Sequence, residues 1–247
     1  MTNTPATKSE KRVIVALDVD TADEARKIVA ELGSDAGAFK IGLQLFTAAG
    51  PDLVREISAQ HKVFLDLKFH DIPTTVAKAG IEVARLGVWM FNVHAVGGSE
   101  MMRTTVDAVR SVCARENLAT PLLIGVTVLT SSDTNVLREC GIEMEAREQV
   151  LRFARLAAES GLDGVVSSPM ETAAIKSSIE RRGFIVVTPG VRTDSATNDD
   201  QKRVMTPRQA VSEGSDYLVI GRPILQAKDR AAALRRICEE IDAAVHD

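Results

Sequence analysis

The stretch Val63-Phe64-Leu65-Asp66-Leu67-Lys68-Phe69-His70-Asp71-Ile72-Pro73-Thr74-Thr75 decides the fold, because it is an apolar strand that carries two charges and then turns into a helix. Its first residues are the aromatic and branched side chains typical of a strand. Side chains alternate across a strand, so Asp66 and Lys68 share one face and the apolar residues around them share the other. Unpaired charges in an apolar strand are costly to desolvate. We therefore predict that the charged face opens into a cavity at the strand's C-terminal end, and that Pro73 begins a helix.

Short apolar runs alternate with amphipathic stretches along almost the whole chain. The runs predict strands at Val13–Asp18, Ala38–Gly42, Lys62–Lys68, Met90–His94, Leu122–Val128, Gly164–Ser167, Phe184–Val187 and Tyr217–Ile220. The amphipathic stretches predict helices at Ala22–Leu32, Pro51–Gln60, Thr74–Leu86, Ser99–Glu116, Glu143–Ser160, Glu171–Ile179, Pro207–Ser212 and Asp229–Val245. Strands and helices in this order indicate parallel strands joined by helical crossovers.

Eight strand–helix units in 247 residues favour a single-domain (β/α)8 TIM barrel over a doubly wound open sheet. We expect residues 1–11 to form a flexible N-terminal segment and residues 12–247 to form the catalytic barrel. No linker, low-complexity tract or repeat of fixed period divides the chain.

The composition is that of an ordinary globular protein, with 45% hydrophobic and 26% charged residues. A net charge of −4 argues against broad binding to nucleic acid or to an anionic membrane, but leaves room for a local basic pocket that binds a phosphorylated metabolite. Cys113, Cys140 and Cys238 lie far apart and without metal-ligand spacing, which indicates thiols in a reducing compartment. With neither a signal peptide nor a membrane-spanning run visible, we expect a cytoplasmic protein.

Polar residues gather where the predicted strands end, and in a barrel these ends form the active face. They are Asp18, Lys40, Asp66, Lys68, His94, Thr127–Thr130, Ser167, Pro189 with Arg192, and Gly221 with Arg222. The gathering of polar residues at so many strand ends supports an active site there more strongly than any single residue does.

Asp18 and Lys40 each allow a structural and a functional interpretation. Asp18 is either a turn residue before the helix at Ala22 or a cavity residue that binds sugar hydroxyls, and Asp20 and Thr21 are better placed than Asp18 to cap that helix. Lys40 either extends to solvent from a strand end or points into the cavity. We favour the cavity for Lys40, because an inward charge needs a partner such as Asp66 or Asp18.

Asp66, Lys68 and Asp71 are spaced as proton-transfer chemistry needs, although a structural ion-pair network fits the same spacing. An ammonium about 4 Å from a carboxylate gains around 4 kcal/mol at an effective dielectric of about 20. An array of alternating signs fixes its side chains and suits a general acid. His70 and His94 are interpreted as structural, since no metal-ligand spacing surrounds them.

A second site is predicted at the end of the chain. Thr188–Arg192 follows the seventh strand and Gly221–Ile224 follows the eighth, and barrels often bind phosphate at these two loops. Arg222 can make bidentate bonds to phosphate, although an ordinary glycine turn with a surface arginine is also possible. The polar segment Thr193–Arg203, with Gln201 in it, is interpreted as a lid over the bound ligand.

At these residues the sequence closely resembles orotidine 5'-monophosphate decarboxylases of the bacterial type. The matching stretches are Leu17-Asp18, Phe39-Lys40-Ile41-Gly42, Asp66 to Thr75, Val126-Thr127-Val128-Leu129-Thr130-Ser131, Thr188-Pro189-Gly190-Val191-Arg192 and Ile220-Gly221-Arg222-Pro223-Ile224. They occur in the family's order and span most of the chain, and Asp66 to Thr75 is the most specific of them.

The resemblance implies a homodimeric (β/α)8 barrel that converts orotidine 5'-monophosphate to uridine 5'-monophosphate and carbon dioxide, in the last step of de novo pyrimidine nucleotide synthesis, without metal or organic cofactor. It implies Lys68 as the proton donor to pyrimidine C6, and Asp66 beside the substrate carboxylate. The remaining implied roles are Lys40 in the charged array and at the ribose, Asp18 at the ribose, Thr130 and Ser131 at the pyrimidine, Asp71 and Thr75 lent to the neighbouring subunit's site, and Pro189, Arg192, Gln201, Gly221 and Arg222 at the substrate's phosphate end.

Two other functions remain open at this point. One is a metal-dependent phosphosugar decarboxylase or aldolase on the same scaffold, which would lose activity with a chelator. The other is a non-catalytic barrel that binds a phosphorylated metabolite. The cluster of charges argues against the second, because a binding pocket has little reason to keep so costly an arrangement.

Overall fold

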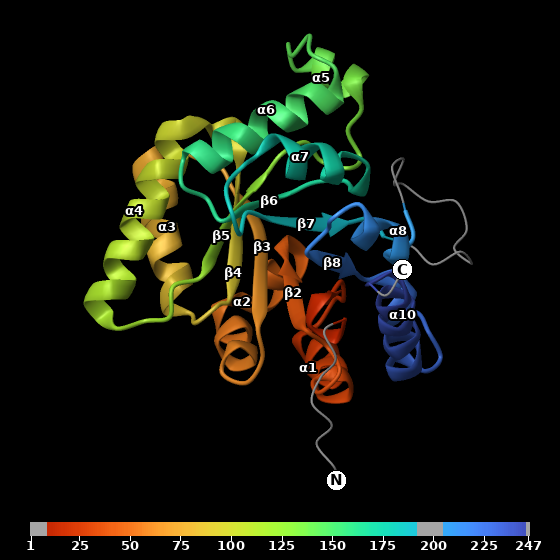
Figure 1. Cartoon of the computed structure of the whole chain (residues 1–247). Helices are drawn as coiled ribbons and strands as arrows, with labels where there is room; N and C mark the ends of the chain where they lie inside the picture. The colour runs from red at the N-terminus through yellow and green to blue at the C-terminus, as the bar shows by residue number, and fades with distance from the viewer. Residues whose placement is uncertain (1–8, 192–204, 246–247) are drawn as a thin grey trace.

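Eight parallel strands pair in chain order, and the last strand pairs with the first, so that the sheet closes into a barrel (Figure 1). The computed structural model describes residues 9–191 and 205–245. The strands are β1 (Val13–Ala16), β2 (Ala38–Gly42), β3 (Val63–Phe69), β4 (Met90–His94), β5 (Leu122–Val126), β6 (Gly164–Val166), β7 (Ile185–Pro189) and β8 (Tyr217–Ile220). This confirms the predicted (β/α)8 barrel.

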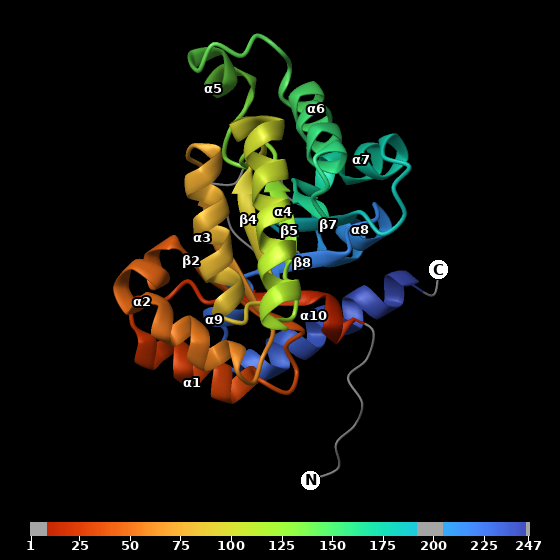
Figure 2. The same cartoon turned by 90° about the vertical axis from the view of Figure 1, so that its left-hand side faces the viewer.

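Helices surround the barrel on its outer side, and α3 and α4 lie side by side in both views (Figures 1 and 2). The α-helices are α1 (Ala22–Leu32), α2 (Leu43–Ser58), α3 (Pro73–Arg85), α4 (Gly98–Glu116), α5 (Thr134–Glu139), α6 (Ala146–Glu159), α7 (Thr172–Ser178), α8 (Pro207–Ser212), α9 (Arg222–Leu225) and α10 (Arg230–Val245). Short 3-10 turns form η1 (Glu10–Arg12), η2 (Ala95–Gly97) and η3 (Pro169–Glu171).

The best-predicted helices have clear start signals in the sequence. Thr21 caps α1 by accepting the Glu24 backbone N–H, as expected for a residue in that position. Thr206 and Gln209 form a reciprocal capping box at the start of α8. Both helices have the bounds that the sequence predicted.

Three helical segments were not predicted. Residues 43–49 form the first turns of α2, which bends at Gly50, where φ is +72°, before Pro51. A proline after a left-handed glycine looks locally like a helix start, so the earlier turns were missed. The short helices α5 and α9 lie in the loops after β5 and β8, where neither shows a long apolar period.

The alternation predicted for β3 separates two apolar layers. Val63 and Leu65 pack outward in the large core between strands and helices. Phe64 points inward, into a smaller cluster inside the barrel that is formed by Ile14, Ala16, Ala38, Phe64, Met90, Ile124, Val187 and Val219. Two residues beyond Phe64 on the same inner face comes Asp66, where the interior changes from apolar to charged.

The described chain starts close to its other end. Ser9 is buried, and its hydroxyl donates to Asp242 of α10 at 2.7 Å. The expected division of the chain at residue 12 stays a prediction, since residues 1–8 lie outside the described part.

Candidate active site

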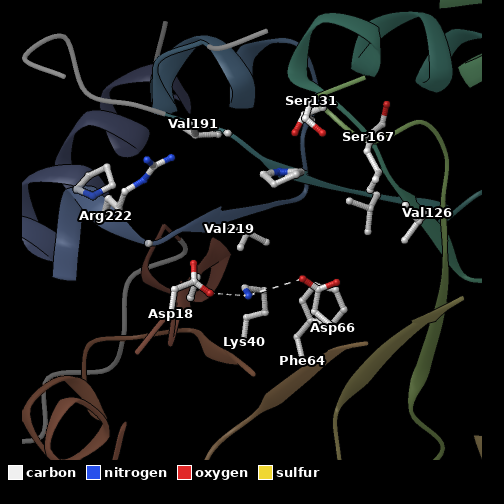
Figure 3. Close-up of a pocket in the computed structure, with 18 of the residues that line it drawn as sticks. Asp18, Lys40, Phe64, Asp66, Val126, Ser131, Ser167, Val191, Val219 and Arg222 are labelled. Carbon is white, nitrogen blue, oxygen red and sulfur yellow. Dashed lines mark hydrogen bonds and ion pairs between the residues drawn. The ribbon is translucent and has the colours of Figure 1, made fainter. Parts of the chain in front are cut away.

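A cavity of about 650 Å³ opens at the C-terminal ends of the strands (Figure 3). This volume suits a small-molecule ligand. The predicted residues that line it are Asp18, Lys40, Asp66, Lys68, Thr130, Ser131, Pro189, Gly221 and Arg222. Together with Ser167 after β6, residues from seven of the eight strands and their loops thus meet in one place, as the barrel geometry requires.

Four charges of alternating sign run across the floor of this cavity. Lys40 Nζ lies 3.0 Å from Asp18 Oδ1 and 3.7 Å from Asp66 Oδ2, so Lys40 stands between the two carboxylates (Figure 3). Lys68 Nζ lies 2.7 Å from Asp66 Oδ1. Lys40 is only 8% exposed, which makes these partners necessary. The prediction that Lys40 pairs with Asp18 or Asp66 is confirmed for both, and we call these four side chains the charged array.

The array depends on an irregularity in β3. The pairing of β3 with β4 shifts between Leu65 and Phe69, so that β3 carries a bulge at this point. Lys68 within the bulge has φ of +55°, a left-handed conformation that is uncommon for a residue with a side chain. Such strained conformations persist where the surrounding structure holds them, often at functional sites.

Asn92 of β4 was missed by the sequence reasoning. Its Nδ2 donates to Asp66 Oδ1 at 2.7 Å, and its Oδ1 accepts the Lys68 backbone N–H at 2.8 Å. The available signal was an amide at an inward position of the apolar strand Met90–His94, a place where a polar group needs specific partners.

Two glycines leave room for the array. A Cβ at Gly42 would lie 2.9 Å from Lys40 Nζ, and one at Gly221 would lie 3.1 Å from Asp18 Oδ2. The missing side chains at these positions therefore allow the charges to approach the backbone. The role of Gly42 was not predicted, although its position directly after Lys40-Ile41 is visible in the sequence.

The two histidines form a pair beside the array rather than in the cavity lining. The rings of His70 and His94 lie 5.9 Å apart, centroid to centroid. Burial, reinforced by the charges of His70 and Lys68 and opposed by Asp66, lowers the pKa of His94 below its usual 6.5. His94 is therefore held neutral near pH 7, which agrees with a structural role.

The loops after β7 and β8 line another part of the cavity, and Arg222 lies well away from Asp66 (Figure 3). Gly190 has φ of +77°, which favours glycine at this turn. Arg192, Gln201 and the predicted lid Thr193–Arg203 lie outside the described residues. Ser167, whose buried hydroxyl has no partner among the described residues, also lines the cavity.

Asp71 and Thr75 do not join the charged array within one chain. Both are exposed, and Asp71 Oδ1 accepts the Ile72 backbone N–H at 2.6 Å. The interpretation of Asp66, Lys68 and Asp71 as one network therefore needs correction for the single chain. The turn after β3 carries Asp71 outward, whereas the bulge turns Lys68 back toward Asp66.

Across residues 9–191 and 205–245, no group of three or more His, Cys, Asp or Glu side chains is arranged to hold a metal ion. In the same ranges, no helix has both the length and the apolar character that crossing a membrane requires.

A closed barrel with paired acids and lysines at its mouth defines a (β/α)8 protein built to act on a small polar molecule. Residues 11–237 match the model of the orotidine 5'-phosphate decarboxylase / HUMPS family. The chain belongs to this family.

Individual relatives agree with this membership. Orotidine 5'-phosphate decarboxylase of Syntrophotalea carbinolica is 51% identical, with 97% of this chain and 98% of the relative covered. The Moorella thermoacetica protein of the same name is 52% identical, covering 95% of this chain and 93% of the relative. The crystal structure of orotidine 5'-phosphate decarboxylase from Lactobacillus acidophilus superposes with a TM-score of 0.82 at 38% identity, covering 93% of this chain and 98% of that one.

Proposed function

We propose that this protein decarboxylates orotidine 5'-monophosphate to uridine 5'-monophosphate and carbon dioxide, the last step of de novo pyrimidine nucleotide synthesis. The carrying observation is the charged array at the barrel mouth, in which Lys68 Nζ is held 2.7 Å from Asp66 Oδ1. Family membership, with relatives about half identical over nearly the whole chain, supports the same activity.

Lys68 is the proton donor in this mechanism. The bond between C6 and the carboxylate carbon breaks, carbon dioxide leaves, and the electron pair stays on C6. The Lys68 ammonium stabilises this developing negative charge and gives C6 a proton, so that a C–H bond replaces the C–C bond. The neutral amine then regains a proton from solvent. An ammonium held in place before the reaction stabilises the transition state more than the substrate, which is the condition for catalysis.

Asp66 and Lys40 hold that ammonium in position. Asp66 accepts a hydrogen bond from Lys68, and Lys40 balances the other oxygen of the same carboxylate. Asp66 also faces the substrate carboxylate in this proposal, so that loss of carbon dioxide relieves the repulsion between two negative charges. The acids of the array are paired with lysines, an arrangement that supports chemistry without a metal or organic cofactor.

The rest of the cavity binds the nucleotide. Asp18 and Lys40 contact the ribose, and Thr130 with Ser131 contacts the pyrimidine. The phosphate lies at the other end, at Pro189, Arg192, Gln201, Gly221 and Arg222. Binding energy from phosphate contacts far from C6 contributes to catalysis by closing a site that excludes water.

A homodimer completes the site. Around the exposed Asp71, the C-terminal ends of neighbouring strands expose the large apolar side chains of Leu43 (64%), Ile72 (63%) and Val96 (50%). Exposed apolar side chains that gather on one face mark association surfaces. In this dimer, Asp71 and Thr75 reach the partner's cavity and add a negative charge beside the partner's array. The protein acts in the cytoplasm, where its three thiols stay reduced.

The activity is tested by adding orotidine 5'-monophosphate to the purified protein and following the absorbance change of the pyrimidine, with and without a chelator. We expect equal turnover in both. Turnover that is lost with chelator would indicate a metal-dependent reaction, and tight nucleotide binding without turnover would indicate a binding protein.

The shared site is tested by mixing two inactive variants, Lys68→Ala and Asp71→Ala. Each hybrid dimer holds one site with both groups intact, so an equal mixture should recover about a quarter of wild-type activity. Absence of recovery after verified subunit exchange would contradict the sharing of Asp71.

A further inference from the structure

Asn92 is the fully buried polar residue that lies closest to the charged array. It is 0% exposed and is not among the residues that line the cavity. Its neighbours on the inner and outer faces of β4, Met90, Phe91 and Val93, are apolar and equally buried. A buried carboxamide without partners is costly, because it has lost its hydrogen bonds to water, so its presence requires specific hydrogen bonds.

Those hydrogen bonds both lead to the proposed proton donor and its partner. Asn92 Nδ2 donates to Asp66 Oδ1, the same oxygen that accepts from Lys68 Nζ. Asn92 Oδ1 accepts the backbone N–H of Lys68. The Asn92 carboxamide thus binds the Lys68 backbone directly. It also binds the carboxylate oxygen that accepts from the Lys68 ammonium.

The bulge in β3 explains why a side chain is needed here. Where the pairing of β3 with β4 shifts between Leu65 and Phe69, the regular ladder cannot accept the Lys68 N–H. Asn92 supplies that acceptor from the neighbouring strand. The bond also holds Lys68 at φ of +55°, a conformation that is unfavourable for a residue with a side chain and persists only where neighbours hold it.

We propose that Asn92 is a positioning residue, which fixes the Asp66 carboxylate and the left-handed backbone of Lys68 so that the ammonium faces the cavity. This inference rests on the proposed decarboxylation. Asn92 does not touch the substrate, because it is fully buried and lies outside the cavity lining.

A carboxamide makes both contacts at neutral pH, which an ionised carboxylate or an apolar side chain of similar size does not. An ionised aspartate would accept the Lys68 N–H but would face Asp66 with a like charge and no proton to donate. A leucine of similar size would fill the space and offer neither bond. These two substitutions therefore separate the packing of Asn92 from its hydrogen bonds.

The first test compares Asn92→Leu with wild type in steady-state kinetics with orotidine 5'-monophosphate. The variant loses both hydrogen bonds that hold Asp66 and the Lys68 backbone in position. Because hydrogen bonds to charged groups are stronger than neutral ones, we expect kcat to fall roughly 10- to 100-fold. KM should stay within about threefold, because substrate contacts are intact. The matched control is Thr105→Val, which removes a buried hydrogen bond to Met101 O within α4, away from the cavity. That control should lower the melting temperature and leave kcat unchanged.

The second test uses the pH profile of Asn92→Asp. Two adjacent carboxylates share a proton more readily as pH falls, and the protonated carboxyl group of this variant can donate to Asp66. We expect kcat to be low at neutral pH and to recover in part on acidification relative to wild type. A purely structural role for Asn92 would change the melting temperature without changing this profile.

The third test needs no substrate, and therefore separates this inference from the proposed function. Hydrogen exchange of the Lys68 amide should be at least about tenfold faster in Asn92→Leu than in wild type. Unchanged exchange would overturn the positioning, and faster exchange with wild-type kcat would overturn its catalytic consequence. Absence of turnover by wild type would instead overturn the proposed function.

Discussion

The barrel interior has two halves that are built from the same strands but have opposite chemistry. We call the half toward the N-terminal ends of the strands the lower half and the half toward their C-terminal ends the upper half. The lower half is apolar and fully packed, with Ile14, Phe64, Met90 and Ile124 among its members. It ends at the T-shaped pair of Trp89 and Tyr217. The upper half holds the charged array around an open cavity. On β3 the interior changes from apolar to charged between two successive inward-facing residues, Phe64 and Asp66.

This difference separates stability from chemistry along the barrel axis. Each large apolar side chain in the lower half contributes about 1.5–3 kcal/mol by leaving water. Each charge in the upper half costs desolvation, which its oppositely charged neighbours offset. Substitutions in the lower half should therefore change folding, and substitutions in the upper half should change turnover.

The largest effect is expected from placing a charge in the lower half. Ile124→Asp would bury a carboxylate with no partner among apolar side chains, which should destabilise the fold by about 3–5 kcal/mol or more. The matched control, Ile124→Val, should cost about 0.5–1.5 kcal/mol. Urea unfolding measures both. A stable, active Ile124→Asp protein would show that the lower half tolerates a buried charge, which would contradict its assignment to stability alone.

A methyl group added beside the array should change turnover and leave folding intact. Gly42 has φ of −91°, which alanine adopts freely, but its Cβ would lie 2.9 Å from Lys40 Nζ. Gly42→Ala should displace the ammonium and lower kcat/KM by about 10- to 100-fold. Gly125→Ala is the matched control, because its Cβ meets Ala157 of α6 on the outer side of the barrel. Wild-type kinetics for Gly42→Ala would contradict a tightly fitted array.

The smallest effect is expected at the C-terminal end of β4, where His94 is kept neutral beside the array. Because its folded pKa is lowered, the unfolded chain binds the proton more readily, and stability falls as pH drops below about 6.5 toward the folded pKa. His94→Asn should remove this loss. Free energies of unfolding at about pH 7.5 and about pH 5.5 test the prediction. An equal loss in wild type and variant would exclude His94 as its source.

The sequence predicted the barrel because strand order and apolar runs are local signals. It also predicted most of the cavity, since charged residues at strand ends meet wherever parallel strands close into a barrel. Lys40 could be assigned its partners in advance because a buried ammonium requires carboxylates nearby.

The shape of the array was not predictable from local patterns. The bulge at Lys68 depends on the register of β3 against β4, which the sequence of either strand does not reveal. Asn92 acquires its role only through that bulge, so one asparagine in an apolar strand did not indicate which groups it would bind. Asp71 fits the spacing of a three-residue network, yet the turn after β3 carries it to the surface.

Turnover by Lys68→Ala is the most direct test of the claim that a fixed ammonium in the upper half drives the reaction. Wild-type and variant proteins are each saturated with orotidine 5'-monophosphate, and the pyrimidine absorbance is followed. We predict at least about a 10³-fold lower rate for the variant, with unfolding and binding of uridine 5'-monophosphate close to wild type. A correctly folded Lys68→Ala protein that decarboxylates at the wild-type rate would contradict the account.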